Sequence, residues 1–521
     1  MSNSSPATAR THRFRLHDTL TGELVALPQR VPGACSIYAC GPTVYGPIHV
    51  GNARPAVVFD TLVRHLRASG VDVTYVRNFT DIDDKIIKVA NTTGETPMEV
   101  AERNIAAYHR DTESVGCQRP NREPRVSEHL PEIIAMVQTL IEKGHAYEVD
   151  GDVYYRVKSF EGYGKLSKRD FTQASEDEHQ RKNDASMKED PHDFALWKSS
   201  KEDEGPGARW CSPWGDGRPG WHIECSAMAR KWLGETFDVH GGGIDLIFPH
   251  HENEIAQSEA CTGHPFASAW MHNGFININN KKASKSDADT YTAEVKHYFV
   301  LKHLCERVEP EAVRLWILGT HYRSPLSFEF VVDEALPCKS NELRPTTFPA
   351  LEEAEGRLEY FYATRARMFA RAHFAEGAPA ARPDHIVSVI VRSFHEAMDE
   401  DLNTAAALGH LSELYKRANE LCDANRKEPI ETRALLEALD HTSHVLGIGQ
   451  ENPAAFAARV RTRRALARGI DPAAIDALLT ERIEARKRKD FARSDAIRDE
   501  LIAKKIELRD DPAGTVWRIL A

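Results

Sequence analysis

The segment FPHHENEIA (residues 248–256) places two histidines and two glutamates within one turn of a predicted helix. Such side chains can bind a metal ion or exchange protons. His250 and Glu254 are four residues apart, so they lie on one face of that helix. Pro249 suits a first helical turn, and the helix dipole stabilises acidic residues there. By itself the segment favours a charged helix start, and a metal or acid–base site needs partners from elsewhere in the chain.

A second candidate is the loop PIHVGN (residues 47–52), which lies between a predicted strand and a predicted helix. The N–H groups and the dipole at a helix N-terminus suit a phosphate group. Gly51 lets a flat nucleotide base approach the backbone, and His49 can donate to phosphate oxygens. A loop histidine without a special role is the more common explanation for such a short motif taken alone.

The third candidate is NNKKASKSD (residues 279–287), a lysine- and serine-rich loop after a predicted strand. Lys282 and Lys285 offer cations to a triphosphate, and such a loop can close over a leaving pyrophosphate. Stretches of this composition are usually solvated surface. The loop is a stronger indication together with PIHVGN, because both follow strands of one predicted α/β unit.

The elements that must position these loops alternate between strand and helix. CSIYAC (35–40) predicts a buried strand, residues 53–70 predict a helix that ends at Gly70, and VDVTYVRNF (71–79) predicts the next strand. The same pattern returns in TFDVHGGGIDLIF and SAWMHNGFININ. In such folds ligands bind at the carboxyl ends of parallel strands, so we predict a Rossmann-like sheet with the three candidate segments at that edge.

A chain of 521 residues is too long for one ordinary core. We expect an α/β catalytic domain over residues 1–335, with an insertion at about 120–215 where the sequence turns irregular. An α-helical bundle over 336–455 and a small basic domain over 456–521 are expected to follow.

The composition excludes several classes of protein. It contains 41% hydrophobic and 28% charged residues, which is typical of a globular protein. No stretch approaches the ~20 apolar residues of a membrane span, and the first residues lack the apolar core of a secretory signal. We therefore expect a cytoplasmic protein without membrane contact. Nine cysteines in so long a chain do not make a disulfide scaffold, but some can be metal ligands.

The charge distribution is uneven. The net charge of −11 argues weakly against nucleic acid, but Arg459 to Lys505 contain 14 Lys and Arg against 8 Asp and Glu, a local charge of +6. Residues 481–505 have a helical pattern with a basic face, either an ordinary solvated helical hairpin or a surface for RNA phosphates and unpaired bases. Trp517 is a candidate for stacking on such a base or for packing.

Two of these motifs resemble known signatures. HVGN and KASKS resemble the HIGH and KMSKS signatures of class I aminoacyl-tRNA synthetases. Further segments, in order along nearly the whole chain, resemble the cysteinyl-tRNA synthetase family: YACGPTVYGPIHVGNARP, YVRNFTDIDDKII, PGWHIECSAM, FDVHGGGIDLIFPHHENEIAQS, THYRSPL, MDEDLNTAAAL and KDFARSDAIRDEL. The resemblance implies a monomeric enzyme that activates L-cysteine with ATP and transfers it to tRNA(Cys).

The resemblance also implies one zinc ion per chain. The family's ligands are two cysteines, a histidine and a glutamate, which match Cys40, Cys225, His250 and Glu254. These donor types are reasonable zinc ligands, although either cysteine alone reads as a buried structural residue. A soft thiolate–zinc bond would separate cysteine from serine better than an apolar pocket, which provides only ~1–3 kcal/mol for a small size difference. HHENE is not HExxH, so a zinc protease is disfavoured.

Other positions carry over from the resemblance in the same way. The expected cysteine-pocket residues are Thr80, Trp221 and His240, of which Trp221 and His240 could equally be structural. The expected ATP contacts are His49, Gly51, Asn52, Asp245 and Lys285. Catalysis would rest on positioning and charge stabilisation by His49, Asn52, Lys282 and Lys285, with a magnesium ion accompanying ATP.

Three departures from the family pattern leave other functions open. Asn52 replaces the last histidine of HIGH, Ala283 replaces the methionine of KMSKS, and DADT follows where the family often has Leu-Gly-Asn. We expect altered loop closure with activity retained. One alternative is a ligase that joins cysteine to an amino sugar in thiol biosynthesis, although such ligases lack a terminal domain like 456–521. The other is a non-catalytic tRNA-binding paralogue.

Overall fold

The computed structural model describes most of the chain. The described residues are 14–170, 187–201, 207, 209–279, 281–282, 292–332, 346–424, 426–504, 506–511 and 514–519. Of Lys282 only the backbone is described, and Ala283, Lys285 and the DADT segment lie outside the described residues.

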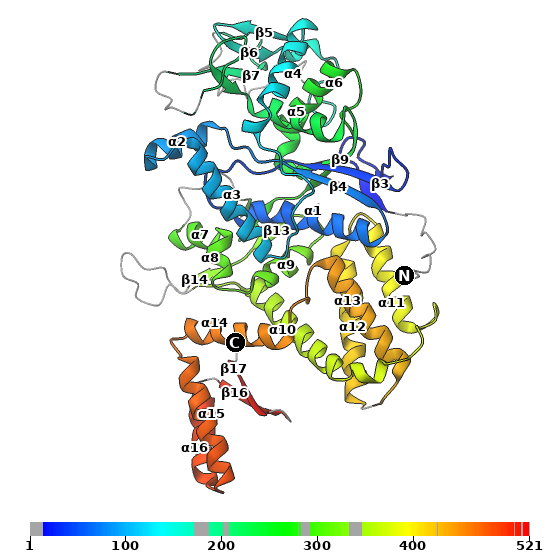
Figure 1. The fold of residues 1–521 in the computed structure, drawn as a ribbon, viewed down its shortest axis with the longest axis vertical. Helices are drawn as coiled ribbons and strands as arrows, with labels where there is room; N and C mark the ends of the chain where they lie inside the picture. The colour runs from blue at the N-terminus through cyan, green and yellow to red at the C-terminus, as the bar shows by residue number, and fades with distance from the viewer. Residues whose placement is uncertain are drawn as a thin grey trace, which may run out of the picture.

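A four-stranded parallel sheet lies at the centre of the molecule (Figure 1). In spatial order its strands are β10 (Ala267–Asn273), β9 (Phe237–Gly243), β3 (Ala34–Ala39) and β4 (Asp72–Arg77). On β3, Ile37 pairs with Val239 on one side and Tyr75 on the other, and these three residues are buried. The sheet confirms the predicted Rossmann-like α/β class, and its carboxyl ends share one edge.

Helix α1 (Val50–Ala68) follows β3 and crosses back to β4, as the sequence pattern predicts. Gly70 adopts a left-handed φ of 89° beyond its end, which suits a residue without a Cβ. The helix buries both apolar and charged side chains. Asp60 accepts hydrogen bonds from Arg64 (2.8 Å) and from Arg314 (2.5 Å), and all three side chains are buried.

Shorter elements surround the sheet. The helices of this region are α2 (Asp84–Thr93), α3 (Pro97–Ser114), α4 (Leu130–Glu142), α5 (Trp221–Leu233), α6 (Glu252–Thr262), α7 (Ala293–Tyr298), α8 (Leu301–Cys305) and α9 (Pro310–Leu318). The strands are β1 (Arg15–His17), β2 (Leu24–Ala26), β11 (Ile276–Ile278), β12 (Lys281–Lys282), β13 (Leu326–Phe328), β14 (Val331–Val332) and β15 (Thr346–Thr347). In the part of the chain that is described, no helix combines the length and apolar character needed to cross a membrane.

The insertion contains more regular structure than its sequence indicates. Four short strands form an antiparallel sheet: β5 (Ala146–Val149), β6 (Asp152–Tyr155), β7 (Phe194–Ser199) and β8 (Gly217–Pro219). Tyr155 and Trp197 on these strands are buried in a core that they share with residues of α4 and α5. Figure 1 shows these helices beside the sheet. Strands of three to six residues among polar segments leave little alternation, which is why the pattern reads as irregular.

A helical bundle follows, formed by α10 (Pro349–Ala370), α11 (Ile386–Asp399), α12 (Thr404–Asp423) and α13 (Pro429–Leu446). It packs against the far end of α1, where His65 lies 2.8 Å from a carboxylate oxygen of Asp399. Arg64 and Arg314 also donate to the carbonyls of His444 and Leu446 at the end of α13. The bundle is therefore fastened to the helix whose other end carries the HVGN loop.

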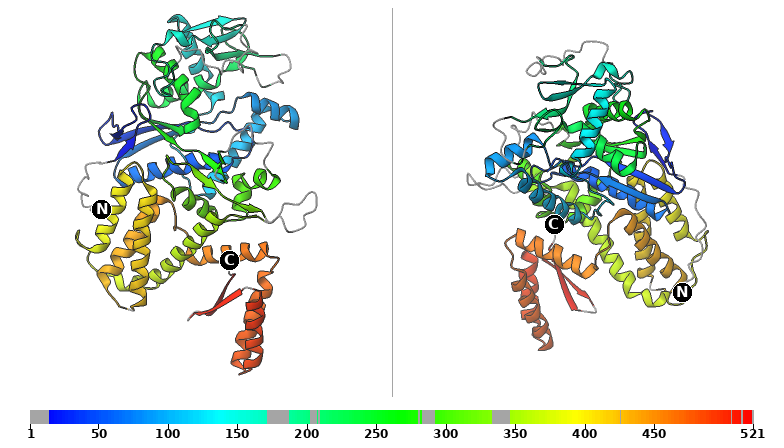
Figure 2. Two further views of the ribbon diagram at one scale, coloured as in Figure 1. Left: turned by 180° about the vertical axis from the view of Figure 1, so that it is seen from behind. Right: turned by 45° about the horizontal axis from the view of Figure 1, so that its top comes forward.

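The last segment forms the helical hairpin that one interpretation of its sequence predicts. After α14 (Pro453–Ala467), α15 (Pro472–Lys487) and α16 (Phe491–Ala503) form an arm that projects from the body (Figure 2). Lys489 has a left-handed φ of 62°, and Asp490 caps α16. The β16 (Ile506–Asp511) and β17 (Gly514–Ile519) hairpin packs on the arm, where Trp517 is 4% exposed and donates to Asp476 (2.7 Å). Trp517 is thus a packing residue.

Candidate active site

The candidate residues gather at the carboxyl edge of the parallel sheet. Cys40 follows β3, Thr80 lies three residues beyond β4, and Asp245 lies two residues beyond β9. The backbone N–H of Cys40 donates to the carbonyl of Gly241 on β9 (3.1 Å). This is the edge at which an open α/β sheet binds its ligands.

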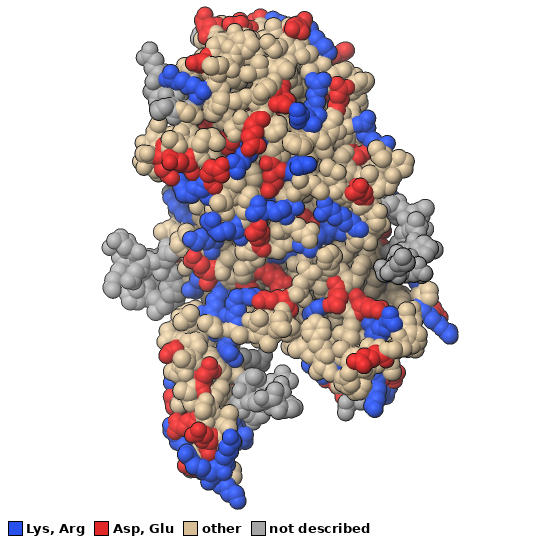
Figure 3. All heavy atoms as spheres, viewed as in Figure 1, with Lys and Arg blue, Asp and Glu red and all other residues tan. Residues whose placement is uncertain are grey.

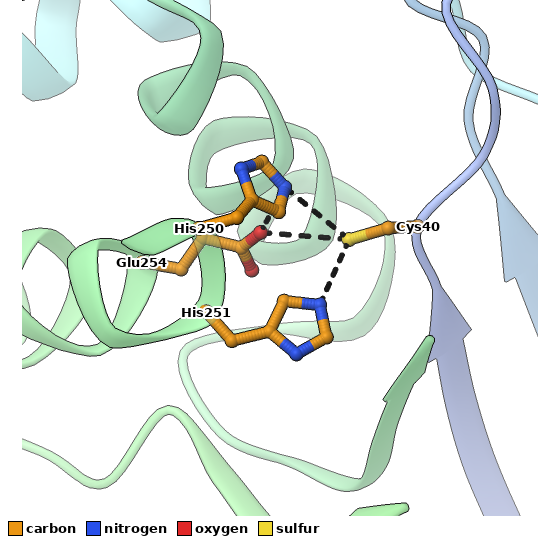
Figure 4. Close-up of side chains that lie close together, drawn as sticks. All are labelled: Cys40, His250, His251 and Glu254. Atoms are coloured by element: carbon orange, nitrogen blue, oxygen red, sulfur yellow. Dashed lines mark hydrogen bonds and ion pairs between the residues drawn. The ribbon is translucent and has the colours of Figure 1, made fainter. Parts of the chain in front are cut away.

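Four predicted metal ligands come together at this edge. The Sγ of Cys40 lies 3.7 Å from the Sγ of Cys225, 3.5 Å from Nε2 of His250 and 3.5 Å from Oε1 of Glu254. Nε2 of His250 is 2.6 Å from that same carboxylate oxygen. Cys225, His250 and Glu254 are buried, and Cys40 is partly buried. Figure 4 shows Cys40, at the end of β3, facing the histidine and glutamate side chains that come from the helical segment on the other side of the cluster.

The four predicted ligands come from three local structures. Cys40 directly follows β3, and Cys225 lies in the second turn of α5, which begins at Trp221. His250 and Glu254 lie where a wide turn over residues 247–251 runs into α6. The four-residue spacing puts this pair on one helix face, as predicted from the sequence.

The protonation of the cluster fits a site for a cation. A hydrogen bond from the Cys40 thiol lowers the pKa of Cys225 to about 6, against the effect of burial. Burial opposes charge on His250, but the Glu254 carboxylate raises its pKa to about 10. A proton thus lies among a thiolate and a carboxylate, where a divalent cation can replace it. Two thiols, an imidazole and a carboxylate fit zinc by donor type.

His251 is a further donor at the same cluster. Its Nε2 lies 3.3 Å from the Cys40 sulfur, and one ligand atom each from Cys40, His250, His251 and Glu254 lie within 4.8 Å of one another. Its Nδ1 lies 2.7 Å from Nε2 of His272. Burial lowers the pKa of His251 well below its ordinary value and that of His272 to about 3, so both rings are neutral. In the sequence, His251 could have been found as a possible donor because it directly follows His250.

Aromatic contacts orient His250. The ring of Trp221 stacks on it with centroids 4.3 Å apart and an interplanar angle of 22°. Trp221 is 40% exposed, so it is not a core residue. It covers the His250 ring on the side of the cluster that faces solvent. Nδ1 of His222 lies 2.9 Å from Nδ1 of His250. His222 was missed in the sequence, although it adjoins Trp221 in the segment WHIEC.

The other two pocket candidates flank the cluster. Nε2 of His240 lies 2.5 Å from Oε2 of Glu254, and its ring stacks on Trp270 with centroids 4.6 Å apart. The hydroxyl of Thr80 donates to Oε2 of Glu224 (3.1 Å). Burial raises the pKa of Glu224 well above its ordinary value, so this carboxyl favours its neutral form. Both candidates therefore touch carboxyl groups at the base of the site.

The HVGN loop forms the start of α1. The backbone N–H of His49 donates to Oδ1 of Asn52 (3.2 Å), so Asn52 closes the first turn. The His49 ring stacks on Phe299, with centroids 5.1 Å apart and an interplanar angle of 19°. A Cβ on Gly51 would lie 2.8 Å from that ring, so only glycine leaves the ring in place.

The remaining ATP-side candidates are described to different extents. Asp245 is exposed just beyond β9, and its carboxylate lies over Gly243. The backbone of Lys282 pairs with Asn277 between β12 and β11. Lys285 lies outside the described residues.

Family models match the chain in three consecutive parts. The model described as the class I (C) tRNA synthetase catalytic domain matches residues 27–336, more than half of the chain. A DALR domain matches residues 393–450, and a cysteinyl-tRNA ligase anticodon binding domain matches residues 471–518. The last match covers the projecting arm and its hairpin.

Curated relatives match over nearly their whole length. A cysteine–tRNA ligase of Geobacter metallireducens is 44% identical over 97% of this chain and 99% of its own. One of Oleidesulfovibrio alaskensis is 45% identical over 97% of this chain and 100% of its own. Among solved structures, a methionyl-tRNA synthetase of Mycobacterium tuberculosis with methionyl-adenylate has a TM-score of 0.54 and 14% identity, over 83% of this chain and 96% of its own. At that identity the last likeness concerns the fold alone.

Proposed function

Since the chain belongs to the family of class I cysteine–tRNA ligases, we propose that Cys40, Cys225, His250 and Glu254 hold a zinc ion that selects its amino acid. The chain uses ATP to charge tRNA with cysteine. The observation that supports the zinc proposal is the convergence of two thiols on an imidazole–carboxylate pair. When bound, the ion supplies a soft bond to the substrate thiolate, which serine cannot match at neutral pH.

The side chains around the ligands would set the geometry of this selection. Trp221 and His222 hold the His250 ring, and His240 holds one oxygen of Glu254. Side chains that neighbouring contacts hold in place need little reorganisation when a metal ion binds. The preference for sulfur over oxygen would then come from the bond between the metal ion and the substrate. Trp221 is also the exposed wall against which the substrate side chain would rest.

The chemistry needs no side-chain nucleophile. The carboxylate oxygen of cysteine attacks the α-phosphorus of ATP, a P–O bond forms, and pyrophosphate leaves. A ribose hydroxyl of the terminal tRNA nucleotide then takes the acyl group, and AMP leaves. In our proposal His49 and Asn52 place the phosphates at the start of α1, and Lys282 and Lys285 stabilise charge on the pyrophosphate together with the magnesium ion of ATP.

The two alternatives are disfavoured on separate grounds. The match of residues 471–518 to an anticodon binding domain favours tRNA over an amino sugar as the acceptor. High identity to named ligases over nearly the full length favours an active enzyme over a non-catalytic paralogue. We propose that the bundle and the arm hold the tRNA.

The ligand set is tested by metal content. The purified full-length protein is expected to contain about one zinc per chain, and Cys225→Ser is expected to reduce this at least tenfold in metal analysis. His251→Gln is the matched variant, because it keeps the size and one polar contact of a residue outside the proposed set. It is expected to retain most of the zinc.

If His251→Gln lost its zinc and Cys225→Ser kept it, His251 would take the place of Cys225 in the ligand set. Unchanged zinc in both variants would remove both residues from it. Circular dichroism of each variant separates loss of the ion from loss of the fold.

The arm provides a prediction about tRNA. Its tip presents the exposed cations Lys487, Arg488 and Lys489, visible as a blue group at the lower end in Figure 3. Their replacement by glutamate is expected to raise the KM for tRNA at least tenfold, because phosphate contacts are lost and like charges repel. Cysteine-dependent exchange of pyrophosphate into ATP should not change.

The control is Arg103→Glu on α3, whose side chain is 51% exposed and pairs with the partly exposed Glu95. It should leave both measurements within about twofold, since an exposed charge pair contributes little. An unchanged KM for tRNA in the arm variant would contradict the assignment of the arm tip to tRNA.

A further inference from the structure

Arg54 is a buried cation in the second turn of α1, five residues after His49. Its two terminal nitrogens make five contacts of hydrogen-bond length, all to backbone carbonyls. Nη1 contacts Gly274 (2.8 Å) and Phe275 (2.7 Å), and Nη2 contacts His321 (3.3 Å), Tyr322 (3.1 Å) and Ser324 (2.5 Å). Within the described part of the chain, none of these partners is a carboxylate.

This environment is costly for a charged group. Burial lowers the pKa of Arg54 to about 10, so the guanidinium stays charged at neutral pH. Its hydrogen-bond partners among the described residues include no carboxylate that would offset its desolvation. An apolar side chain would fill the space at lower cost but would leave the five carbonyls unsatisfied. The planar fork of arginine is suited to hold two sets of carbonyls at a fixed separation.

The two sets of carbonyls belong to one small sheet. Residues 274–275 join β10 to β11, and residues 321–324 lead into β13. β11 pairs with β13 on one side and with β12, which contains Lys282, on the other. The carbonyl of Phe275 also accepts a hydrogen bond from the N–H of Leu326. The two segments are therefore in contact where Arg54 donates to their carbonyls.

The fit between these segments is tight. A Cβ on Gly274 would lie 2.6 Å from the carbonyl oxygen of Arg323 and 2.7 Å from that of Ser324. The turn of residues 321–324 is held from its other side by Asp401, which accepts from Tyr322 and Arg323 at 2.6 Å each. The segments therefore have little room to move independently of Arg54.

We propose that Arg54 is a positioning residue that fixes the β12–β11–β13 sheet, and with it the start of the lysine loop, against the HVGN end of α1. The two halves of the ATP site would then keep one relative placement because one side chain bridges them. This inference rests on the proposed function, in which His49 and Lys282 act on the same ATP.

The test compares two buried arginines on the same helix. Arg54→Lys keeps the charge but loses the fork that reaches both sets of carbonyls. Arg64→Lys is the matched control, because Arg64 is also buried and bonds Asp60 and carbonyls of Gly116 and His444, none of which lies in the small sheet. For each protein the thermal midpoint and the zinc content are measured, together with kcat and KM for ATP and cysteine in pyrophosphate exchange. Titration of the adenylate gives the concentration of active sites, so that kcat is expressed per active site.

Both variants are expected to lose stability, but only Arg54→Lys should change catalysis per active site. We expect the KM for ATP to rise about tenfold or kcat to fall about a hundredfold, with the KM for cysteine and the zinc content changed less than threefold. Gly274→Ala in the full chain should give the same kinetic change, because it separates the same segments and leaves Arg54 intact.

The inference would be overturned if Arg54→Lys and Gly274→Ala both had the same kcat and KM for ATP per active site as Arg64→Lys. Arg54 would then be a merely structural residue. A wild-type protein without cysteine-dependent exchange would be a different result. It would overturn the proposed function, and this inference with it.

Discussion

Replacement of Cys40 by serine is expected to lower kcat/KM for cysteine by on the order of 10⁴-fold in pyrophosphate exchange. The Cys40 sulfur lies within 3.7 Å of donor atoms from Cys225, His250 and Glu254, so its loss removes the common neighbour of the cluster. A hydroxyl is a poor ligand for a soft site at neutral pH. The preference for cysteine over serine should fall with the zinc content, because it depends on the bond between zinc and the substrate sulfur, and zinc binding depends on Cys40.

Cys35 provides the matched control in the same strand. It is buried, lies near the other end of β3, and its thiol is outside the cluster. Cys35→Ser should keep its zinc and its selectivity and should change kcat/KM by less than about threefold. A Cys40→Ser protein that still binds zinc and still rejects serine would contradict the proposed selection mechanism.

The second large effect concerns stability. Asp60→Asn is expected to reduce the free energy of unfolding by about 3–5 kcal/mol, because it removes the carboxylate and leaves the guanidinium groups of Arg64 and Arg314 buried without a counter-charge. The change keeps the size of the side chain, so packing is preserved. Urea-induced unfolding followed by circular dichroism measures it.

An exposed ion pair gives the comparison. Arg15 and Glu400 are paired on the surface, with side chains that are each 50% exposed. Glu400→Ala should cost less than about 1 kcal/mol. Equal losses in the two variants would show that burial adds nothing to the Asp60 cluster.

The parts of the fold that follow from local pattern could be predicted from the sequence. Residues 35–40, 53–70 and 71–79 carry clear strand and helix periods, and they form β3, α1 and β4. The four proposed zinc ligands came from a family resemblance. Their spacing of up to 214 residues carries no local signal, apart from the pair of His250 and Glu254 on one helix face.

Other features depend on tertiary contacts that local pattern does not encode. Asp60 and Arg64 are spaced like an ion pair on a helix surface, and the local sequence around Arg54 does not indicate burial, yet all three are buried. The break before α16 did carry a signal, because Asp490 is a favoured helix cap and follows Lys489 in a left-handed conformation.

The order of strands in the central sheet has a consequence for synthesis of the chain. β3 pairs with β4 as soon as Arg77 has been made, but its other neighbour, β9, begins only at Phe237. At about 5–20 residues per second, the 159 residues between Arg77 and Phe237 take roughly 10–30 s to translate. During that interval one edge of an apolar strand is without its partner, so the nascent protein must be shielded from aggregation until the ribosome delivers β9.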